Sequence, residues 1–152
     1  MDKKTRDNSA MMNGLYWWGV PTLFRCPHQP ETEGCDIALV GVPHSTGNGT
    51  TQRDQHLGPR AVRNISAQGR RGHLKFGISP WEMCDIRDFG DVPLPEANNN
   101  EQCIERITEF YEGIAESGVR PVSIGGDHSI TGGILQAIVG PKSKLTNGEK
   151  AV

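Results

Sequence analysis

The clearest periodic pattern of apolar and polar residues lies between residues 100 and 117. Asn100 can cap a helix at its start, and Gly118 stands where a terminating glycine belongs. Six apolar residues recur at helical spacing and form one stripe: Cys103, Ile104, Ile107, Phe110, Tyr111 and Ile114. The pattern predicts an amphipathic helix over residues 100–117.

Nearly continuous apolar runs predict the strands. Residues 36–42 are apolar at almost every position, which is typical of a strand buried on both faces of a parallel sheet. Residues 84–89 predict a second strand, and Val122 and Ile124 indicate a short, buried third strand. The helix over 100–117 leads into this third strand through a short joint, which indicates a strand–helix–strand crossover in a parallel sheet.

Two more helices are expected. One begins at Gly58-Pro59, because proline suits a first helical turn, and its buried side is expected to carry Ala61, Val62 and Ile65. The other follows residue 129 and ends at Gly140-Pro141. Residues 64–81 look irregular, with a local basic patch that a solvated loop explains (Arg70, Arg71, His73 and Lys75). The chain is therefore expected to be an α/β protein.

Residues 1–35 are expected to form an amino-terminal extension before the domain that begins at residue 36. Its first ten residues are polar and charged, but apolar and aromatic side chains then gather at Tyr16, Trp17, Trp18, Val20, Leu23 and Phe24. Gly19 and Pro21 interrupt this run, so it is not one regular helix. The simplest expectation is that the segment packs on its own domain.

Composition excludes several classes of protein. A chain of 152 residues ordinarily forms one domain with a real core, and a net charge of −2 gives no indication of nucleic-acid binding. No apolar run is long enough to span a membrane, and no cleavable leader opens the chain. The four cysteines form no Cys-x-x-Cys pair, which favours reduced thiols in a cytoplasmic protein.

The strongest candidate for chemistry follows the third predicted strand. Gly125-Gly126 makes a tight turn, so Asp127, His128 and Ser129 lie at the carboxyl end of the strand, where α/β sheets bind ligands. His128 could ligate a metal, and Asp127 could share that metal or orient the ring. Alternatively, Asp127 or Ser129 caps the next helix and His128 is an ordinary polar residue. On spacing alone, one histidine is not a metal site.

Gly-Gly-Asp-His-Ser after an apolar strand resembles the first metal motif of the ureohydrolase family, which includes arginases and agmatinases. Three further stretches agree with that family in order and spacing. They are Ile-Ala-Leu-Val-Gly-Val-Pro at 37–43, Leu-Gly-Pro-Arg-Ala-Val-Arg at 57–63 and Asp-Phe-Gly-Asp-Val at 88–92. The resemblance covers about residues 16–139. It implies a three-layer αβα arginase-like fold with a parallel sheet, of which residues 36–152 are the amino-terminal part.

The resemblance also implies a chemistry. Two divalent ions, Mn²⁺ or Ni²⁺, activate water that hydrolyses a guanidino group to urea plus an amine or ammonia. Of the family's metal ligands only His128 has a match here; Asp127 matches the acid beside it, with a supporting role, and no catalytic residue is assigned. The full-length family member is expected to be a homo-oligomer, and the aromatic amino-terminal segment could reach a neighbouring subunit.

Substrate selection is expected in the loop over residues 44–57. Many agmatinases carry an acid shortly after Gly-Val-Pro and an arginine two residues before Gly-Pro, whereas this chain has Ser45 and His56. Asn48, Thr50 and Thr51 add neutral hydrogen-bonding groups. The small-molecule substrate is therefore expected to be agmatine, a guanidino acid or free guanidine, and the loop looks more like that of hydrolases acting on free guanidine or short guanidino acids.

The family's later motifs, Asp-Ala-His-x-Asp and Ser-x-Asp-x-Asp, are absent from this sequence. Because they supply most of the metal ligands, the chain is expected to be an incomplete and inactive part of a ureohydrolase. A non-enzymatic α/β module that binds a partner or the full-length enzyme is the alternative.

Overall fold

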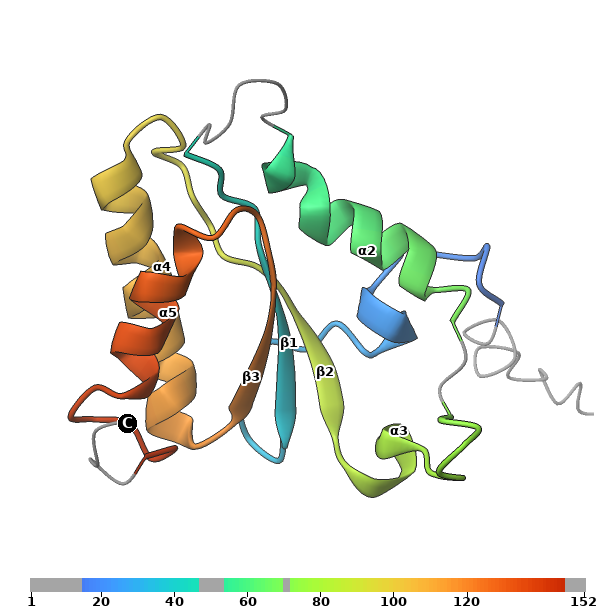
Figure 1. Ribbon diagram of the computed structural model, residues 1–152. Coiled ribbons are helices and arrows are strands. Elements are labelled where there is room, and N and C mark those ends of the chain that lie inside the picture. The colour runs from blue at the N-terminus through green and yellow to red at the C-terminus, as the bar shows by residue number, and fades with distance from the viewer. Residues whose placement is uncertain (1–14, 47–53, 70–71, 147–152) are drawn as a thin grey trace, which may run out of the picture.

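A three-stranded parallel sheet forms the centre of the molecule. The computed structural model describes residues 15–46, 54–69 and 72–146, and its strands are β1 (Ile37–Val42), β2 (Ile86–Asp91) and β3 (Arg120–Gly125). Their order is β2-β1-β3, so β1 is the middle strand, and all of its residues after the first are buried (Figure 1). The predicted parallel sheet is confirmed, with β2 beginning two residues later than expected.

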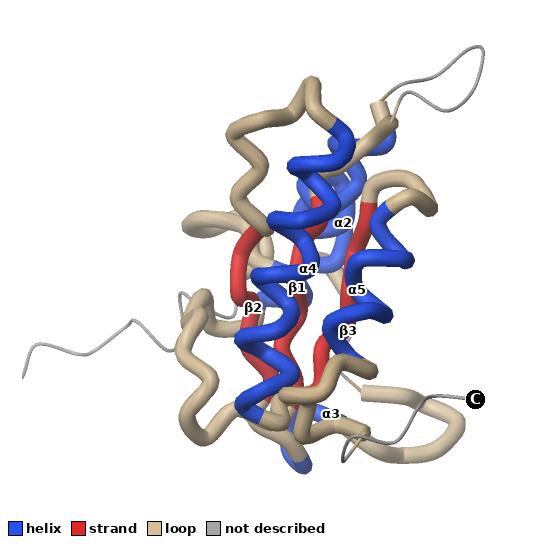
Figure 2. Tube along the Cα trace, turned by 90° about the vertical axis from the view of Figure 1, so that its left-hand side faces the viewer, coloured by secondary structure: helices blue, strands red, loops and turns tan. Residues whose placement is uncertain are grey.

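Helices cover both faces of the sheet. One face carries α2 (Gly58–Ser66), which packs against the short helix η1 (Leu23–Arg25) and is preceded by η2 (Gln55–Leu57). The other face carries α4 (Asn100–Ser117) and α5 (Ile130–Ile138), which lie side by side (Figures 1 and 2). A short helix, α3 (Pro80–Met83), precedes β2. The expected α/β fold with three layers is confirmed.

Helix α4 forms where its periodic pattern predicts it. The stripe of Cys103, Ile107, Tyr111 and Ile114 is buried against the sheet, and Gly118 ends the helix with a φ of 87°. The cap lies one residue earlier than expected, because the side chain of Asn99 accepts a hydrogen bond from the Gln102 amide. Asn100 has another partner, described below.

The buried side of α2 differs from the prediction. Ile65 is 64% exposed and Ala61 is exposed, whereas Pro59 and Ser66 are buried. Positions 59, 63 and 66 share one face of a helix, and Arg63 on that face points at the buried carboxylate of Asp88. Of the predicted residues, Val62 is half-buried and packs against the core cluster, as expected, whereas the inward arginine takes the place predicted for Ala61 and Ile65.

Strand β3 is not the buried strand that was expected. It lies at an edge of the sheet, and within the described residues no strand pairs with its outer side. Val122 is 48% exposed for this reason. An open edge with an apolar residue is a template for pairing with another chain.

The amino-terminal aromatic segment divides in two. Tyr16, Trp17, Trp18 and Val20 are exposed, whereas Leu23 is fully buried in a cluster with residues of β1 and β2. Packing on the same domain is thus confirmed only for the second half of the segment. The proposed domain boundary at residue 35 stays a prediction.

A buried ion pair joins η1, α2 and β2. The Asp88 carboxylate, 1% exposed, accepts hydrogen bonds from Arg63 Nε at 3.0 Å and Nη2 at 3.1 Å, and from the amides of Leu23 at 2.8 Å and Gly90 at 2.9 Å. Arg63 Nη1 also lies 2.6 Å from Asp91 Oδ1. Burial raises the pKa of Asp88, but the hydrogen bonds from Arg63, Leu23 and Gly90 outweigh it and hold that pKa below its ordinary value.

Replacing Asp88 by Asn is predicted to destabilise the fold by about 3–5 kcal/mol at pH 7. Arg63 would lose its buried counter-charge and keep only the carboxylate of Asp91, and the new NH2 group would face donors that now bond to Asp88. The measurement is urea denaturation followed by circular dichroism. The matched control is Arg106→Ala, which removes a solvent-screened pair with Glu96 and is expected to cost much less.

The same pair gives a direction for pH dependence. Because the folded-state pKa of Asp88 is lowered, its contribution to stability is present above the ordinary carboxyl pKa of about 4 and is lost as pH falls toward the folded-state value. In the Asp88→Asn variant, the free energy of unfolding should therefore fall less steeply at acid pH, on the acid limb of its pH dependence. An unchanged acid limb, or equal costs for the two variants, would contradict a structural role for the pair.

The open edge of β3 yields a second prediction. The 152-residue chain should self-associate, and Val122→Lys should reduce the associated fraction by placing a charge on that edge. Light scattering after size-exclusion chromatography measures this. Leu74→Lys, at an apolar residue that is more exposed but lies outside the sheet, is the control and should leave association through the edge intact.

No helix within the described ranges has both the length and the apolar character needed to cross a membrane.

Candidate functional site

The loop after β1 and the turn after β3 are bonded to each other beyond the ends of the strands. The amide of Gly126 donates to the Val42 carbonyl at 3.2 Å, and the amide of Asp127 donates to the His44 carbonyl at 3.0 Å. A Cβ atom at residue 126 would collide with the His44 carbonyl oxygen, so only glycine allows this approach. The glycine turn thus holds Asp127 and His128 beside the loop that follows β1.

The Asp127 carboxylate accepts four hydrogen bonds. Its Oδ2 receives the amide of Thr46 at 2.8 Å and the Thr46 hydroxyl at 2.8 Å, and its Oδ1 receives the amide of Ser129 at 3.0 Å and the Ser129 hydroxyl. Burial raises the pKa of Asp127, but these hydrogen bonds outweigh it and lower that pKa to about 2. Asp127 is therefore ionised at neutral pH.

His128 is exposed at the mouth of the same turn. Its Nδ1 lies 3.0 Å from the Thr131 hydroxyl, and within the described residues the imidazole has no hydrogen bond with Asp127. An accessible neutral imidazole fits the role of one ligand to a divalent ion. The described residues contain no group of three or more His, Cys, Asp or Glu side chains that could hold a metal, so they do not by themselves form a complete metal site.

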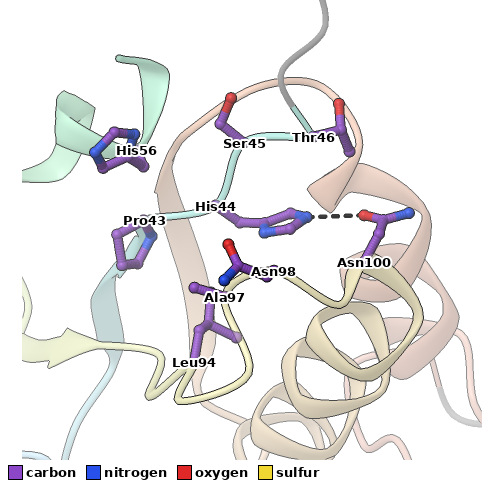
Figure 3. Close-up of a pocket in the computed structure, with 9 residues that line it drawn as sticks. All are labelled: Pro43, His44, Ser45, Thr46, His56, Leu94, Ala97, Asn98 and Asn100. Atoms are coloured by element: carbon purple, nitrogen blue, oxygen red, sulfur yellow. Dashed lines mark hydrogen bonds between the residues drawn. The ribbon is translucent and has the colours of Figure 1, made fainter. Parts of the chain in front are cut away.

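A cavity of about 430 Å³ lies between the loop after β1 and the loop before α4 (Figure 3). Of the four residues expected to select the substrate, His56 lines the cavity, and Asn48, Thr50 and Thr51 lie outside the described residues. The other lining residues are Pro43, His44, Ser45, Thr46, Leu94, Ala97, Asn98 and Asn100. Among the described lining residues there is no carboxylate, lysine or arginine, so this part of the wall consists of apolar, hydroxyl, amide and imidazole side chains.

His44 is a residue that the sequence analysis missed. Its side chain is 3% exposed, and its Nε2 lies 2.9 Å from Asn100 Oδ1 in the first turn of α4 (Figure 3). An amide oxygen can only accept, so in this arrangement Nε2 carries the hydrogen. A polar residue directly after the Gly-Val-Pro that ends a buried strand is the signal that could have indicated it.

Comparison with known proteins places the chain in a family. A family model described as "Arginase family" matches residues 35–146. The chain is 40% identical over 120 residues to "Agmatinase, mitochondrial" of Gallus gallus and 38% identical over 120 residues to "Guanidino acid hydrolase, mitochondrial" of Homo sapiens. Each match covers 79% of this chain but only 35% and 34% of the relative, so the chain spans about a third of the length of these curated relatives.

Solved structures agree with the fold. The proclavaminate amidino hydrolase of Streptomyces clavuligerus matches with a TM-score of 0.74 and 26% identity, over 81% of this chain and 40% of the other. A structure of Trypanosoma cruzi formiminoglutamase "with Mn2+2" matches with a TM-score of 0.62 and 22% identity, over 78% of this chain and 40% of the other. The second likeness supports the fold alone.

The geometry around His128 predicts weak metal binding by the 152-residue chain. One free imidazole leaves most coordination positions of Mn²⁺ or Ni²⁺ to water, so titration calorimetry should show no saturation at stoichiometric metal. His73→Ala, at another exposed imidazole, is the control for incidental binding. Tight one-to-one binding that His128→Ala abolishes and His73→Ala leaves intact would overturn this prediction.

Proposed function

Because the chain belongs to the arginase family, we propose that it is the amino-terminal part of a ureohydrolase. The observation that carries the proposal is the turn over residues 125–129, which presents His128 at the carboxyl end of β3 and bonds to the loop after β1. This is the edge of a parallel sheet at which α/β proteins bind substrates.

The proposed reaction is hydrolysis of a guanidino group to urea plus an amine or ammonia. When bound, a pair of Mn²⁺ or Ni²⁺ ions would lower the pKa of water and supply hydroxide at neutral pH. The formiminoglutamase structure, described as "with Mn2+2", supports manganese in a protein of this fold. His128 would provide one imidazole ligand, and the adjacent Asp127 has no hydrogen bond with its ring within the described residues. The remaining ligands would have to come from outside the described residues.

The described lining of the cavity supports a substrate whose non-reacting end carries no positive charge. The ammonium group of agmatine would lose water there without a carboxylate among the lining residues to compensate it. We therefore favour free guanidine or a short guanidino acid, with His56 and the loop residues Asn48, Thr50 and Thr51 selecting among them. The names of the relatives include both an agmatinase and a guanidino acid hydrolase, so family membership alone does not decide.

Assembly and location are part of the same proposal. The exposed side chains of Tyr16, Trp17, Trp18 and Val20 would be covered if the complete protein is a homo-oligomer. We place the protein in the cytoplasm because its cysteines lack a disulfide pattern; Cys26, Cys35, Cys84 and Cys103 form no disulfide among the described residues.

The open edge of β3 supports a second candidate function, a non-enzymatic module that pairs with a partner or with the full-length enzyme. The two candidates differ in one measurable respect. A catalytic part gains activity when the missing strand ends are supplied, whereas a binding module does not.

The proposed function predicts activity only for a completed protein. The 152-residue chain should release no urea from agmatine, guanidinobutyrate, guanidinopropionate or guanidine with Mn²⁺ or Ni²⁺. A chimera in which this chain replaces the matching segment of the Gallus gallus agmatinase should release urea from at least one of them. In that chimera His128→Ala should lower both metal content and activity, the latter by about 100-fold or more, because it removes a direct ligand.

Two outcomes would refute the argument. Urea above background from the 152-residue chain would contradict the ligand count, and full metal occupancy in the His128→Ala chimera would exclude His128 as a ligand. His73→Ala is the matched control and should leave both quantities unchanged.

A further inference from the structure

We propose that Asp127 is a positioning residue that fixes the start of the loop after β1 against the turn that carries His128. Its two carboxylate oxygens have different partners, since Oδ2 holds Thr46 and Oδ1 holds Ser129. We call this set of hydrogen bonds between Asp127, Thr46 and Ser129 the Asp127 clamp. Its effect on substrates rests on the proposed function, but the clamp itself does not.

The number of hydrogen bonds argues against a role for Asp127 on the metal. An ionised carboxylate has about four lone-pair positions, and Asp127 receives four hydrogen bonds from two amides and two hydroxyls. Ligating a metal or accepting a proton from His128 would require breaking one of them. The Nδ1 atom of His128 is already within hydrogen-bond distance of another residue, Thr131.

The clamp extends the contact between β1 and β3 beyond their last paired residues. Beyond the last ladder pair of β1 and β3, Gly126 bonds to Val42 and Asp127 bonds to His44 through the backbone. The next residues can no longer pair in this way, because the chain turns into α5, and the Asp127 side chain reaches the Thr46 amide instead. The clamp thus determines where the loop leaves the sheet.

The segment that the clamp holds is a wall of the cavity. His44, Ser45 and Thr46 all line it, and His44 is fixed on the opposite side by Asn100 (Figure 3). Loss of the clamp would free this wall on the side of β3 while leaving His128 and its contact with Thr131 in place. We therefore expect Asp127 and Thr46 to influence substrate binding rather than metal binding.

Hydrogen exchange in the 152-residue chain, followed by NMR, tests the clamp directly. Asp127→Asn should speed exchange of the Thr46 amide by about 10- to 100-fold, as expected when a hydrogen bond to a charged group is lost. Thr46→Ser should keep the wild-type rate. Thr46→Val, which removes the hydroxyl bonded to Asp127, should also speed this exchange. Thr108→Val, which removes a hydroxyl bonded within α4, is its matched control and should leave the Thr46 amide at the wild-type rate. A Thr46 amide that is unprotected in the wild type, or unchanged in Asp127→Asn, would overturn the proposal.

Kinetics in the chimera separate positioning from metal binding. Thr46→Val should raise KM several-fold at unchanged kcat and metal content. Thr46→Ser, which keeps the hydroxyl, should have the same KM as the unsubstituted chimera. Asp127→Asn should keep its metal. Loss of metal from Asp127→Asn to the extent seen for His128→Ala would show that Asp127 serves the metal and would overturn the proposal. An inactive chimera would count against the proposed function, while hydrogen exchange would still decide the clamp.

Discussion

The pairing of Arg63 with Asp88 is the constraint on which the other contacts of this domain depend. A buried carboxylate is tolerated only when its lone pairs are filled, and Asp88 fills them with two nitrogens of Arg63 and the amides of Leu23 and Gly90. These donors come from three separate segments of the chain. The orientation of α2, the docking of η1 and the path of the chain after β2 are therefore fixed at one point.

The stretches that resemble the family have different roles once this pair is seen. Arg63 in the stretch 57–63 and Asp88 in the stretch 88–92 form the ion pair, and Gly41 in the first stretch lies against the same two segments. A Cβ atom there would collide with the Asp91 carboxylate and with Pro59. The stretch 125–129 instead carries Asp127 and His128. Asp127 repeats the arrangement of Asp88, with four donors around one carboxylate, but it has no arginine partner among the residues described. Only His128 in this stretch is left with an accessible group for chemistry.

The sequence predicted the elements that depend on residues close together in the chain. The stripe of α4 and the apolar run of β1 need no knowledge of distant residues, and both elements lie where the sequence places them. The buried side of α2 could not be predicted in this way, because Arg63 turns inward toward a partner 25 positions away. The exposure of β3 depends on which strands flank it, and its own residues do not encode that. His44 was missed because its partner, Asn100, belongs to another helix.

The described residues form no complete metal site because most polar side chains at the three strand ends are already bonded to other residues. After β1, the imidazole of His44 is buried and bonded to Asn100; at the end of β2, the Asp91 carboxylate is held by Arg63. After β3, the carboxylate of Asp127 accepts four hydrogen bonds in its clamp, which leaves His128 as the accessible imidazole among them. A two-metal centre needs several carboxylates and imidazoles from several strand ends. In the described residues the acids at these ends hold the scaffold together, so the other ligands of the proposed centre would come from outside the described residues.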